Sequence, residues 1–350
     1  MDAAGEKGRS VTYAKGFSNE NDSMTEQELE KALRTAAEAD VAVIFAGLPE
    51  IFESEGYDRT SMKLPKCQDR LIEEVLKVQP NVVVVLHNGS PVELPWADRV
   101  SAILEMYLGG QGVGEACDRL LFGEANPSGR LAETFPYRLE DNPSFLHFPG
   151  NGKRVLYGED IFVGYRYYDT KKVPVRYAFG HGLSYTEFTY GDLTLSSAQM
   201  TDEDILTVSL KVKNSGKTEG KEVVQLYVAD LCGISERPVK ELKGFAKVHL
   251  LPGEEKTVSM EISARNLSYY EERLGDWYAP SGTYRILIGH ASDDIRLHAD
   301  VVFETKKKIA PSRRFHNNVR RIIGSYENRS RYYGTAGAFG SSGRISRRDE

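Results

Sequence analysis

The sequence has 350 residues, of which 40% are hydrophobic and 27% charged, and its formal net charge at pH 7 is −6. This composition excludes a disordered protein, and the length allows two ordinary domains, each with its own core. No apolar run approaches the ~18 residues of a membrane-spanning helix, and the N-terminus lacks the hydrophobic segment of a secretory signal. We therefore expect no membrane association and a cytoplasmic location.

The charge is distributed unevenly along the chain. Residues 305–350 contain twelve Lys and Arg against three acidic residues, so this segment carries a charge of +9 and residues 1–304 carry −15. An acidic body argues against nucleic-acid binding by that part of the chain. We expect residues 305–350 to be a basic, disordered tail.

Cysteine and histidine give no sign of a metal site. Cys67, Cys117 and Cys232 are widely spaced and form no CxxC motif, and the seven histidines show no ligand spacing. This pattern favours a reducing compartment over a disulfide-bonded scaffold. We expect neither a metal nor a cofactor.

Residues 1–145 alternate between helix and strand patterns. Thr25 and Glu28 have the spacing of a capping box, and apolar residues recur at helical intervals after them. The continuous apolar run 41–45 (VAVIF) predicts a strand buried on both faces of a parallel sheet. Further strands and helices are expected at residues 69–78, 81–86, 101–108 and 114–123. This order predicts an open, mostly parallel α/β sheet with right-handed crossovers.

From residue 188 to residue 304 the apolar residues follow a period of two. Short alternating segments separated by turn residues predict an all-β sandwich. These segments lie at residues 206–212, 224–228, 258–262 and 284–288. Residues 146–187, rich in Gly, Tyr and Phe, are expected to be a connector that packs on both domains.

Two motifs suggest other chemistry only weakly. The glycine-rich segment 109–116 (GGQGVGEA) lies between a strand and a helix, where a dinucleotide-binding loop would lie, but its glycines miss the required spacing. A tight turn is the favoured interpretation, and nucleotide binding is a third hypothesis. Ser90 lacks the glycines of a nucleophile elbow, which argues against a serine hydrolase.

A loop after the first strand pattern contains Glu53, Glu55, Asp58 and Arg59. Most glycoside hydrolases require two carboxylates beside the scissile bond, and open α/β sheets place ligand groups beyond the carboxyl ends of their strands. Acidic loops are also common as solvated surface clusters with one structural ion pair. The pattern alone leaves both interpretations open and favours the surface cluster.

Several motifs together resemble the C-terminal half of glycoside hydrolase family 3, the β-glucosidase type. In chain order they are ESEGYDRTSMKLP, NGSPVELPW, LGGQGVGEACDRLLFGEANPSGRLAETFP, VGYRYYD and FGHGLSYT. The resemblance covers about residues 10–303 and implies a fibronectin type III-like domain for the sandwich.

The resemblance implies a retaining glycoside hydrolase that acts on β-glucosides or a similar sugar. In this family an aspartate nucleophile lies on an N-terminal TIM-type barrel, and a glutamate acid/base comes from a loop of the α/β domain. By position, Glu55 is the implied acid/base and Glu53 the second candidate, while Asp58 and Arg59 would shape the loop. A catalytic acid must keep its proton near neutral pH, which burial or a neighbouring carboxylate would favour.

The resemblance also implies what the chain does not supply. A TIM barrel takes roughly 250 residues, and no such length precedes residue 10. We expect the chain to carry the acid/base without the nucleophile, with a separate barrel polypeptide as a candidate partner. The alternative is a non-catalytic carbohydrate-binding or interaction module derived from the family.

Overall fold

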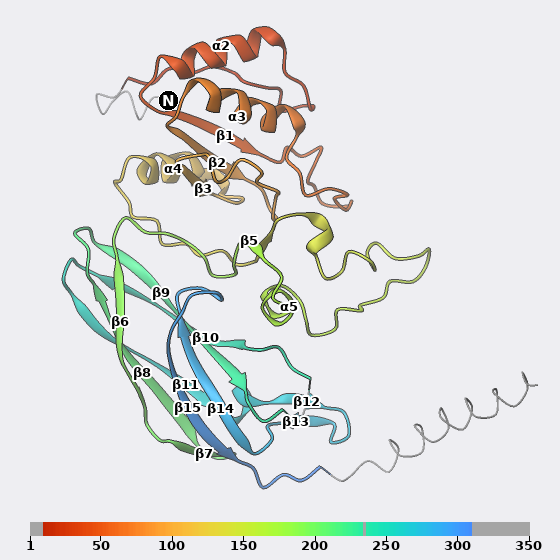
Figure 1. The fold of residues 1–350 in the computed structure, drawn as a ribbon, viewed down its shortest axis with the longest axis vertical. Coiled ribbons are helices and arrows are strands. Elements are labelled where there is room, and N and C mark those ends of the chain that lie inside the picture. The colour runs from red at the N-terminus through yellow and green to blue at the C-terminus, as the bar shows by residue number, and fades with distance from the viewer. Residues whose placement is uncertain (1–9, 234–235, 310–350) are drawn as a thin grey trace, which may run out of the picture. The chain divides into compact units, whose positions relative to one another are not determined.

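The computed structural model describes residues 10–233 and 236–309 (Figure 1). Most of the basic tail expected at residues 305–350 lies outside the described residues. No helix in the described ranges is long and apolar enough to cross a membrane.

The N-terminal part of the chain forms a parallel α/β sheet. Its strands are β1 (Ala42–Gly47), β2 (Val82–His87) and β3 (Ala102–Glu105), in that order across the sheet. Its helices are α2 (Glu26–Ala37), α3 (Lys66–Val78) and α4 (Val113–Leu121). Apolar residues of α2 and α3 share one core with β1 and β2. The α/β domain expected from the alternating pattern is confirmed.

The capping box expected at the start of the first helix is present. The Glu28 backbone N–H donates to Thr25 Oγ1 at 3.2 Å, and the Thr25 backbone N–H donates to Glu28 Oε2 at 2.9 Å. These two bonds satisfy backbone donors that would otherwise have no partner within the helix. The helix therefore begins at Glu26, as the spacing predicts.

The expectation that the run 41–45 is buried on both faces is wrong. Ile44 is buried, but Val43 is 39% exposed and Phe45 53% exposed. Strand β1 is an edge strand of the described sheet, and α2 and α3 pack against only one of its faces. Burial on both faces is found instead in β2, the central strand, where four of the six residues are buried.

The C-terminal part of the chain is a β-sandwich. One sheet has the strand order β10-β9-β14-β15-β7 and the other β11-β8-β6. The strands are β6 (Phe188–Leu195), β7 (Gln199–Thr201), β8 (Ile205–Asn214), β9 (Gly220–Asp230), β10 (Glu241–Leu250), β11 (Glu255–Ser263), β14 (Gly282–Gly289) and β15 (Ile295–Glu304). The inward members of the four alternating segments are buried in one core. The predicted sandwich is confirmed.

Smaller elements complete the described chain. They are the 3₁₀ turns η1 (Gly110–Gly112) and η2 (Leu139–Asp141), strands β4 (Phe135–Pro136), β5 (Val175–Tyr177), β12 (Tyr269–Glu271) and β13 (Asp276–Tyr278), and helices α5 (Tyr165–Lys171) and α6 (Ala264–Leu267). Residues 271–276 belong with residues 306–309 to a small second unit. Within it, Lys307 Nζ lies 2.8 Å from Asp276 Oδ2.

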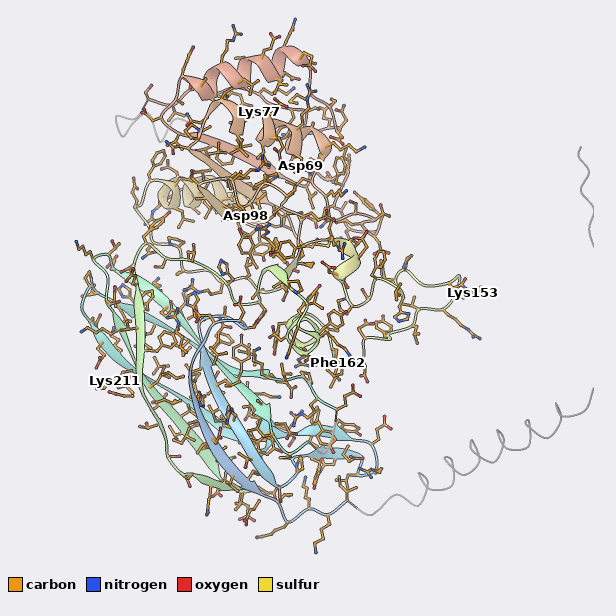
Figure 2. All side chains as sticks on the ribbon, in the orientation of Figure 1. Asp69, Lys77, Asp98, Lys153, Phe162 and Lys211 are labelled. Atoms are coloured by element: carbon orange, nitrogen blue, oxygen red, sulfur yellow. The ribbon has the colours of Figure 1, made fainter. Side chains whose placement is uncertain are left out.

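The segment between the α/β sheet and β6 contacts both domains. Arg176 donates to Asp98 at 2.6 Å, before β3, and the Leu242 backbone N–H on β10 donates to Tyr165 Oη at 2.7 Å. Residues 142–163 instead form a long excursion, with Lys153 at its tip (Figure 2). The α5 and β5 portion of the segment thus contacts both domains, and residues after β5 add further bonds, such as that from the Ser292 backbone N–H to the Phe179 carbonyl oxygen at 2.9 Å.

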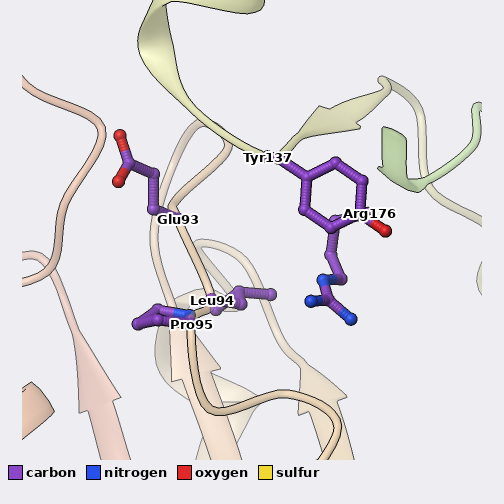
Figure 3. A pocket seen from close by; sticks show the side chains of 5 residues that line it. All are labelled: Glu93, Leu94, Pro95, Tyr137 and Arg176. Carbon is purple, nitrogen blue, oxygen red and sulfur yellow. The ribbon is translucent and has the colours of Figure 1, made fainter. Parts of the chain in front are cut away.

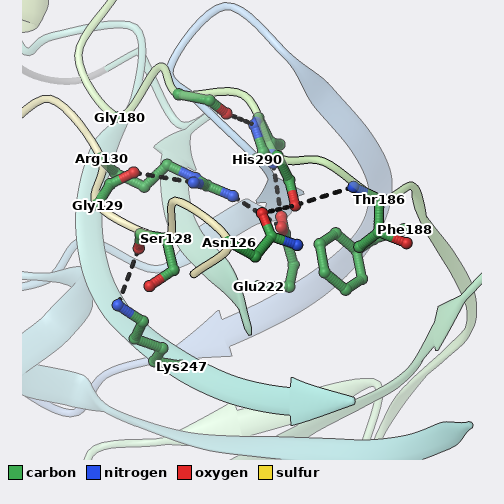
Figure 4. A network of polar contacts seen from close by, with 12 residues as sticks. Asn126, Ser128, Gly129, Arg130, Gly180, Thr186, Phe188, Glu222, Lys247 and His290 are labelled. Carbon is green, nitrogen blue, oxygen red and sulfur yellow. Dashed lines mark hydrogen bonds and ion pairs between the residues drawn. The ribbon is translucent and has the colours of Figure 1, made fainter. Parts of the chain in front are cut away.

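A buried ionic network joins this segment to the sandwich (Figure 4). The Glu222 side chain on β9 has no exposed surface, and Arg130 Nη2 donates to its Oε2 at 2.8 Å. Tyr190 donates to Glu222 Oε1 at 2.7 Å, and His290 Nδ1 lies 2.5 Å from the same oxygen. Burial alone would raise the pKa of Glu222, but His290, Tyr190 and Arg130 lower it overall. The charge of Glu222 is therefore compensated by groups from both sides of the contact.

Candidate functional site

The carboxyl ends of the three parallel strands meet at one edge of the α/β sheet. The loop after β1 contains Glu53 to Arg59, the loop after β2 contains Asn88 to Pro91, and Glu105 ends β3. Open α/β sheets usually bind ligands at this edge. The sequence-predicted residues therefore lie where this fold favours a site.

Glu53 anchors the loop after β1 to the loop after β2. Its carboxylate accepts a hydrogen bond from the Gly89 backbone N–H at 2.5 Å and from the Ser90 hydroxyl at 2.6 Å. Arg59 Nη1 lies 3.5 Å from Glu53 Oε1, and the Glu53 side chain is 20% exposed. Both oxygens of Glu53 are thus engaged with neighbouring donors.

Glu55 stands two positions further along the same loop with a different environment. It is exposed, and within the described part of the chain its carboxylate makes no hydrogen bond or ion pair. Close by, the Tyr57 hydroxyl donates to the Glu50 carbonyl oxygen at 2.5 Å, which closes the loop. The Glu55 carboxylate is therefore held near the loop tip and remains open to a partner or substrate.

Arg59 and Asp58, both expected to shape the loop, have unequal surroundings. Arg59 Nη1 donates to Ser90 Oγ at 2.6 Å and to the Pro91 carbonyl oxygen at 3.3 Å. Burial lowers the pKa of Arg59, and the charge of Glu53 partly offsets this effect. Asp58 is exposed, and its side chain makes no hydrogen bond or ion pair with the described residues. Of these two side chains, only that of Arg59 is hydrogen-bonded to the loop after β2.

Glu105, a carboxylate that sequence reasoning missed, lies behind the anchored loop. Burial raises its pKa to about 7, although the Tyr107 backbone N–H and Asn88 Nδ2 donate to it at 2.8 and 3.3 Å. Glu133 and Glu53 raise it further through their negative charge. The available signal was its position as the last residue of a strand in the same parallel sheet as β1, which the acidic loop follows, and β2, which Asn88 follows.

Glu133 completes this group of carboxylates from a more distant segment. Burial raises its pKa, Glu53 raises it further, and Arg59 lowers it. The pKa of Tyr107 is also raised, by burial and by Glu133 and Glu105. Three carboxylates and one arginine therefore share a poorly solvated region, an arrangement common at functional sites. The described residues contain no group of three or more His, Cys, Asp or Glu placed to hold a metal ion.

A small hollow lies near this edge, lined by Glu93, Leu94, Pro95, Tyr137 and Arg176 (Figure 3). Its volume is about 70 Å³, well below the roughly 300 Å³ of small ligand pockets. The Arg176 guanidinium stacks 4.8 Å from the centre of the Tyr137 ring. This hollow is thus a packing feature of the connecting segment.

Comparison with known protein families agrees with this geometry. Residues 3–185 match the model of the glycosyl hydrolase family 3 C-terminal domain, and residues 222–292 match a fibronectin type III-like domain. The chain belongs to glycoside hydrolase family 3. The family expected from the motifs, and the type of both its domains, are confirmed.

Curated relatives within glycoside hydrolase family 3 are β-glucosidases. The chain is 54% identical over 299 residues to thermostable β-glucosidase B of Acetivibrio thermocellus, covering 85% of this chain and 40% of that protein. It is 46% identical over 272 residues to a β-glucosidase of Kluyveromyces marxianus, covering 77% of this chain and 32% of the relative. The chain thus spans 40% or less of the length of these two relatives.

A solved structure of the family has the same fold. The GH3 β-glucosidase of Bifidobacterium adolescentis superposes with a TM-score of 0.85 at 38% identity, over 90% of this chain and 46% of that one. The β-glucosidase of Kluyveromyces marxianus in complex with glucose gives a TM-score of 0.76 at 43% identity. These likenesses establish the family and the fold, while the roles of Glu55, Glu53, Asp58 and Arg59 stay predictions.

Proposed function

We propose that this chain carries the acid/base of a retaining glycoside hydrolase of the β-glucosidase type, and that Glu55 is that residue. The observation that supports it is the contrast between two neighbouring carboxylates. Glu53 is engaged by Gly89, Ser90 and Arg59, whereas Glu55 is exposed beyond the carboxyl end of a parallel strand. A group that must approach a glycosidic oxygen needs this freedom, so Glu55 is favoured over Glu53.

In the proposed reaction Glu55 donates its proton to the leaving-group oxygen as the glycosidic bond breaks. A second carboxylate, supplied from outside the described residues, attacks the anomeric carbon and forms the glycosyl-enzyme intermediate. Glu55 then removes a proton from the water that hydrolyses this intermediate. Retention requires the two carboxyl groups to be ~5 Å apart, so the partner must reach the exposed loop tip.

The test is a chimera in which residues 10–303 replace the matched part of the A. thermocellus relative. In this chimera, Glu55→Gln should slow hydrolysis of an alkyl β-glucoside by roughly 10²–10⁴-fold. It should lower kcat/KM for a dinitrophenyl β-glucoside much less, because that leaving group needs no proton, but kcat should fall because the water that hydrolyses the intermediate has lost its base. Added azide should restore turnover of the activated substrate as a β-glucosyl azide.

Glu50→Gln is the matched control, because Glu50 is exposed in the same loop. It should leave both substrates unaffected. If Glu53→Gln rather than Glu55→Gln shows the leaving-group dependence, the assignment moves to Glu53. A chimera that binds sugar without turnover would favour the alternative of a non-catalytic module.

The barrel partner is a separate part of the proposal. Mixing this chain with the remaining portion of the A. thermocellus relative, expressed on its own, should restore hydrolysis that neither piece shows. Activity that appears only in the covalent chimera would argue against a separate barrel polypeptide.

A further inference from the structure

His290 lies in the loop between β14 and β15, where the segment that connects the α/β sheet to β6 packs on the sandwich. The Ser292 backbone N–H in this loop donates to the Phe179 carbonyl oxygen at 2.9 Å, and the His290 ring reaches Gly182. Figure 4 shows His290 beside Glu222. The motif 179–182 (FGHG), which the proposed reaction does not use, therefore forms one side of this contact.

The two ring nitrogens of His290 both face oxygen atoms at hydrogen-bond distance. Nδ1 lies 2.5 Å from Glu222 Oε1, and Nε2 lies 2.8 Å from the Gly182 carbonyl oxygen. A carboxylate and a peptide carbonyl only accept, and a neutral imidazole has a single N–H to donate. A neutral ring would thus turn a lone pair toward one of the two oxygens. Both contacts are satisfied only when both nitrogens carry a proton.

Glu222 has no proton of its own to give to His290. Its side chain has no exposed surface, and its carboxylate accepts from Arg130 at 2.8 Å and from the Tyr190 hydroxyl at 2.7 Å. Burial raises the pKa of Glu222, but His290, Tyr190 and Arg130 outweigh burial and hold this pKa below its ordinary value. Burial and Glu222 raise the pKa of Tyr190, so its hydroxyl stays a donor. The second proton must therefore belong to His290.

Charged groups surround His290 from each element packed against it. Arg130 comes from the connecting segment and pairs with Glu222 of β9. Arg296 of β15 lies 2.9 Å from Asp294, whose carbonyl oxygen accepts from the His290 backbone N–H at 3.0 Å. These four side chains form two ion pairs whose charges compensate each other. The charge that can change near neutral pH is thus that of the His290 ring.

His181, a second histidine at this contact, does not supply the charge. Its ring stacks on Tyr177 with the ring centres 5.0 Å apart. Burial lowers the pKa of His181; exposed Asp293 offsets part of this effect, and His290 and Arg130 lower the pKa further. His181 is therefore held neutral.

We propose that His290 is a proton-dependent latch: with both ring nitrogens protonated it ties residues 179–182 to Glu222 of the sandwich, and loss of one proton opens this tie. In an unfolded chain a histidine gives up that proton near about pH 6.5. Folding at higher pH must then take up a proton, so the contact weakens as the pH rises. The latch concerns the contact between the two domains and does not rest on the proposed hydrolase activity.

The first experiment observes the protonation of His290 by NMR in the full chain, labelled with ¹⁵N in its histidine rings. A doubly protonated ring gives two similar nitrogen shifts, whereas a neutral ring gives two widely separated ones. We expect two similar shifts for His290 at about pH 7.5, where an unperturbed histidine is mostly neutral. The signals are assigned by their absence from His290→Gln. If that variant does not fold, replacing the other six histidines one at a time assigns them by elimination.

Denaturant unfolding between about pH 7.5 and about pH 8.5 measures the effect on stability. This range lies above the pKa of about 7 to which burial raises Glu105, so that carboxyl contributes little to the slope. For each pH unit, the unfolding equilibrium constant of the parent chain should rise about three- to tenfold more than that of His290→Gln, and one full proton gives tenfold. His298→Gln, an exposed change on β15, is the matched control and should keep the slope of the parent chain.

Hydrogen exchange gives a local readout that needs no variant. The protection factor of the Ser292 amide, which bonds to Phe179 across the contact, should fall as the pH rises, relative to that of the Leu287 amide within β14. Constant relative protection would mean that the proton does not control the contact. Two widely separated ring shifts for His290 at about pH 7.5, or equal slopes for the parent chain and His290→Gln, would likewise overturn the proposal.

Discussion

The hydroxyl of Ser90 donates a 2.6 Å hydrogen bond to Glu53 Oε1, and this bond fastens the loop after one strand to the loop after its neighbour. Arg59 Nη1 donates to the same hydroxyl oxygen at 2.6 Å. The three side chains form a triangle at the carboxyl edge of the sheet. Glu55 is not part of this triangle, and its carboxylate makes no hydrogen bond or ion pair with the described residues. Because Glu55 follows Glu53 by two positions in the same loop, the bonds of Glu53 limit where Glu55 can lie.

Glu53→Gln should loosen the loop, and Glu55→Gln should not. The first change removes charge-assisted bonds to Gly89 and Ser90, and we expect a loss of about 1–3 kcal/mol of unfolding free energy. The second changes an exposed residue and should stay within about 0.5 kcal/mol. Hydrogen exchange of residues 51–59 measures the local effect. Equal protection in the two variants would contradict the anchoring role of Glu53.

The stability of the chain should fall as the pH rises through the pKa of Glu105. This pKa is raised to about 7 in the folded state, against an ordinary value of 4.5. Between these values the folded state holds more protons than the unfolded state, so raising the pH from about 4.5 to about 7 removes roughly 2 kcal/mol. Asp69, whose pKa burial raises to about 6, acts in the same direction.

Denaturant titrations at a series of pH values measure this slope. Glu105→Gln should flatten it, because a neutral side chain then occupies the poorly solvated position. Glu115→Gln, an exposed position on α4, is the control and should retain the slope. A Glu105→Gln chain with the parent slope would rule out Glu105 as the source.

Arg130→Met should strongly destabilise the contact between the connecting segment and the sandwich. It leaves the fully buried Glu222 carboxylate without its arginine partner, which typically costs about 3–5 kcal/mol. Arg34→Met, an exposed substitution on α2, is the matched control. Replacing Arg130 and Glu222 together should cost less than Arg130→Met alone, as a double-mutant cycle of unfolding free energies can show. Strict additivity would contradict the coupling.

Gly47→Ala should disturb the junction of β1 and β2. A Cβ at Gly47 would lie 2.0 Å from the backbone carbonyl oxygen of His87, the residue paired with it. That oxygen also accepts from the Leu48 N–H at 2.9 Å, so it cannot move freely. We expect a loss of about 3 kcal/mol. Gly191→Ala on β6, where an added Cβ meets open space, is the control for the unfolding measurement.

The sequence predicted what depends on local pattern. The capping box of Thr25 and Glu28 and the period-two strands are set by neighbouring residues, and both were predicted. The burial of β1 was not, because exposure of Phe45 depends on which elements cover the sheet. Glu105 and Glu133 were missed for a related reason: only the folded topology brings residues from the end of β3 and a later loop beside Glu53.

The network around Glu222 also sets an order of events during folding. Arg130 and Glu222 are 92 positions apart, and Gly182 and His290 are 108 apart. Contacts between such distant segments require the largest loss of chain entropy before they form. This network should therefore assemble late in folding, as should the similarly distant pairing of β7 with β15, and changes to it should accelerate unfolding while leaving the folding rate nearly unchanged. It would thus determine how long the two domains stay together once folded.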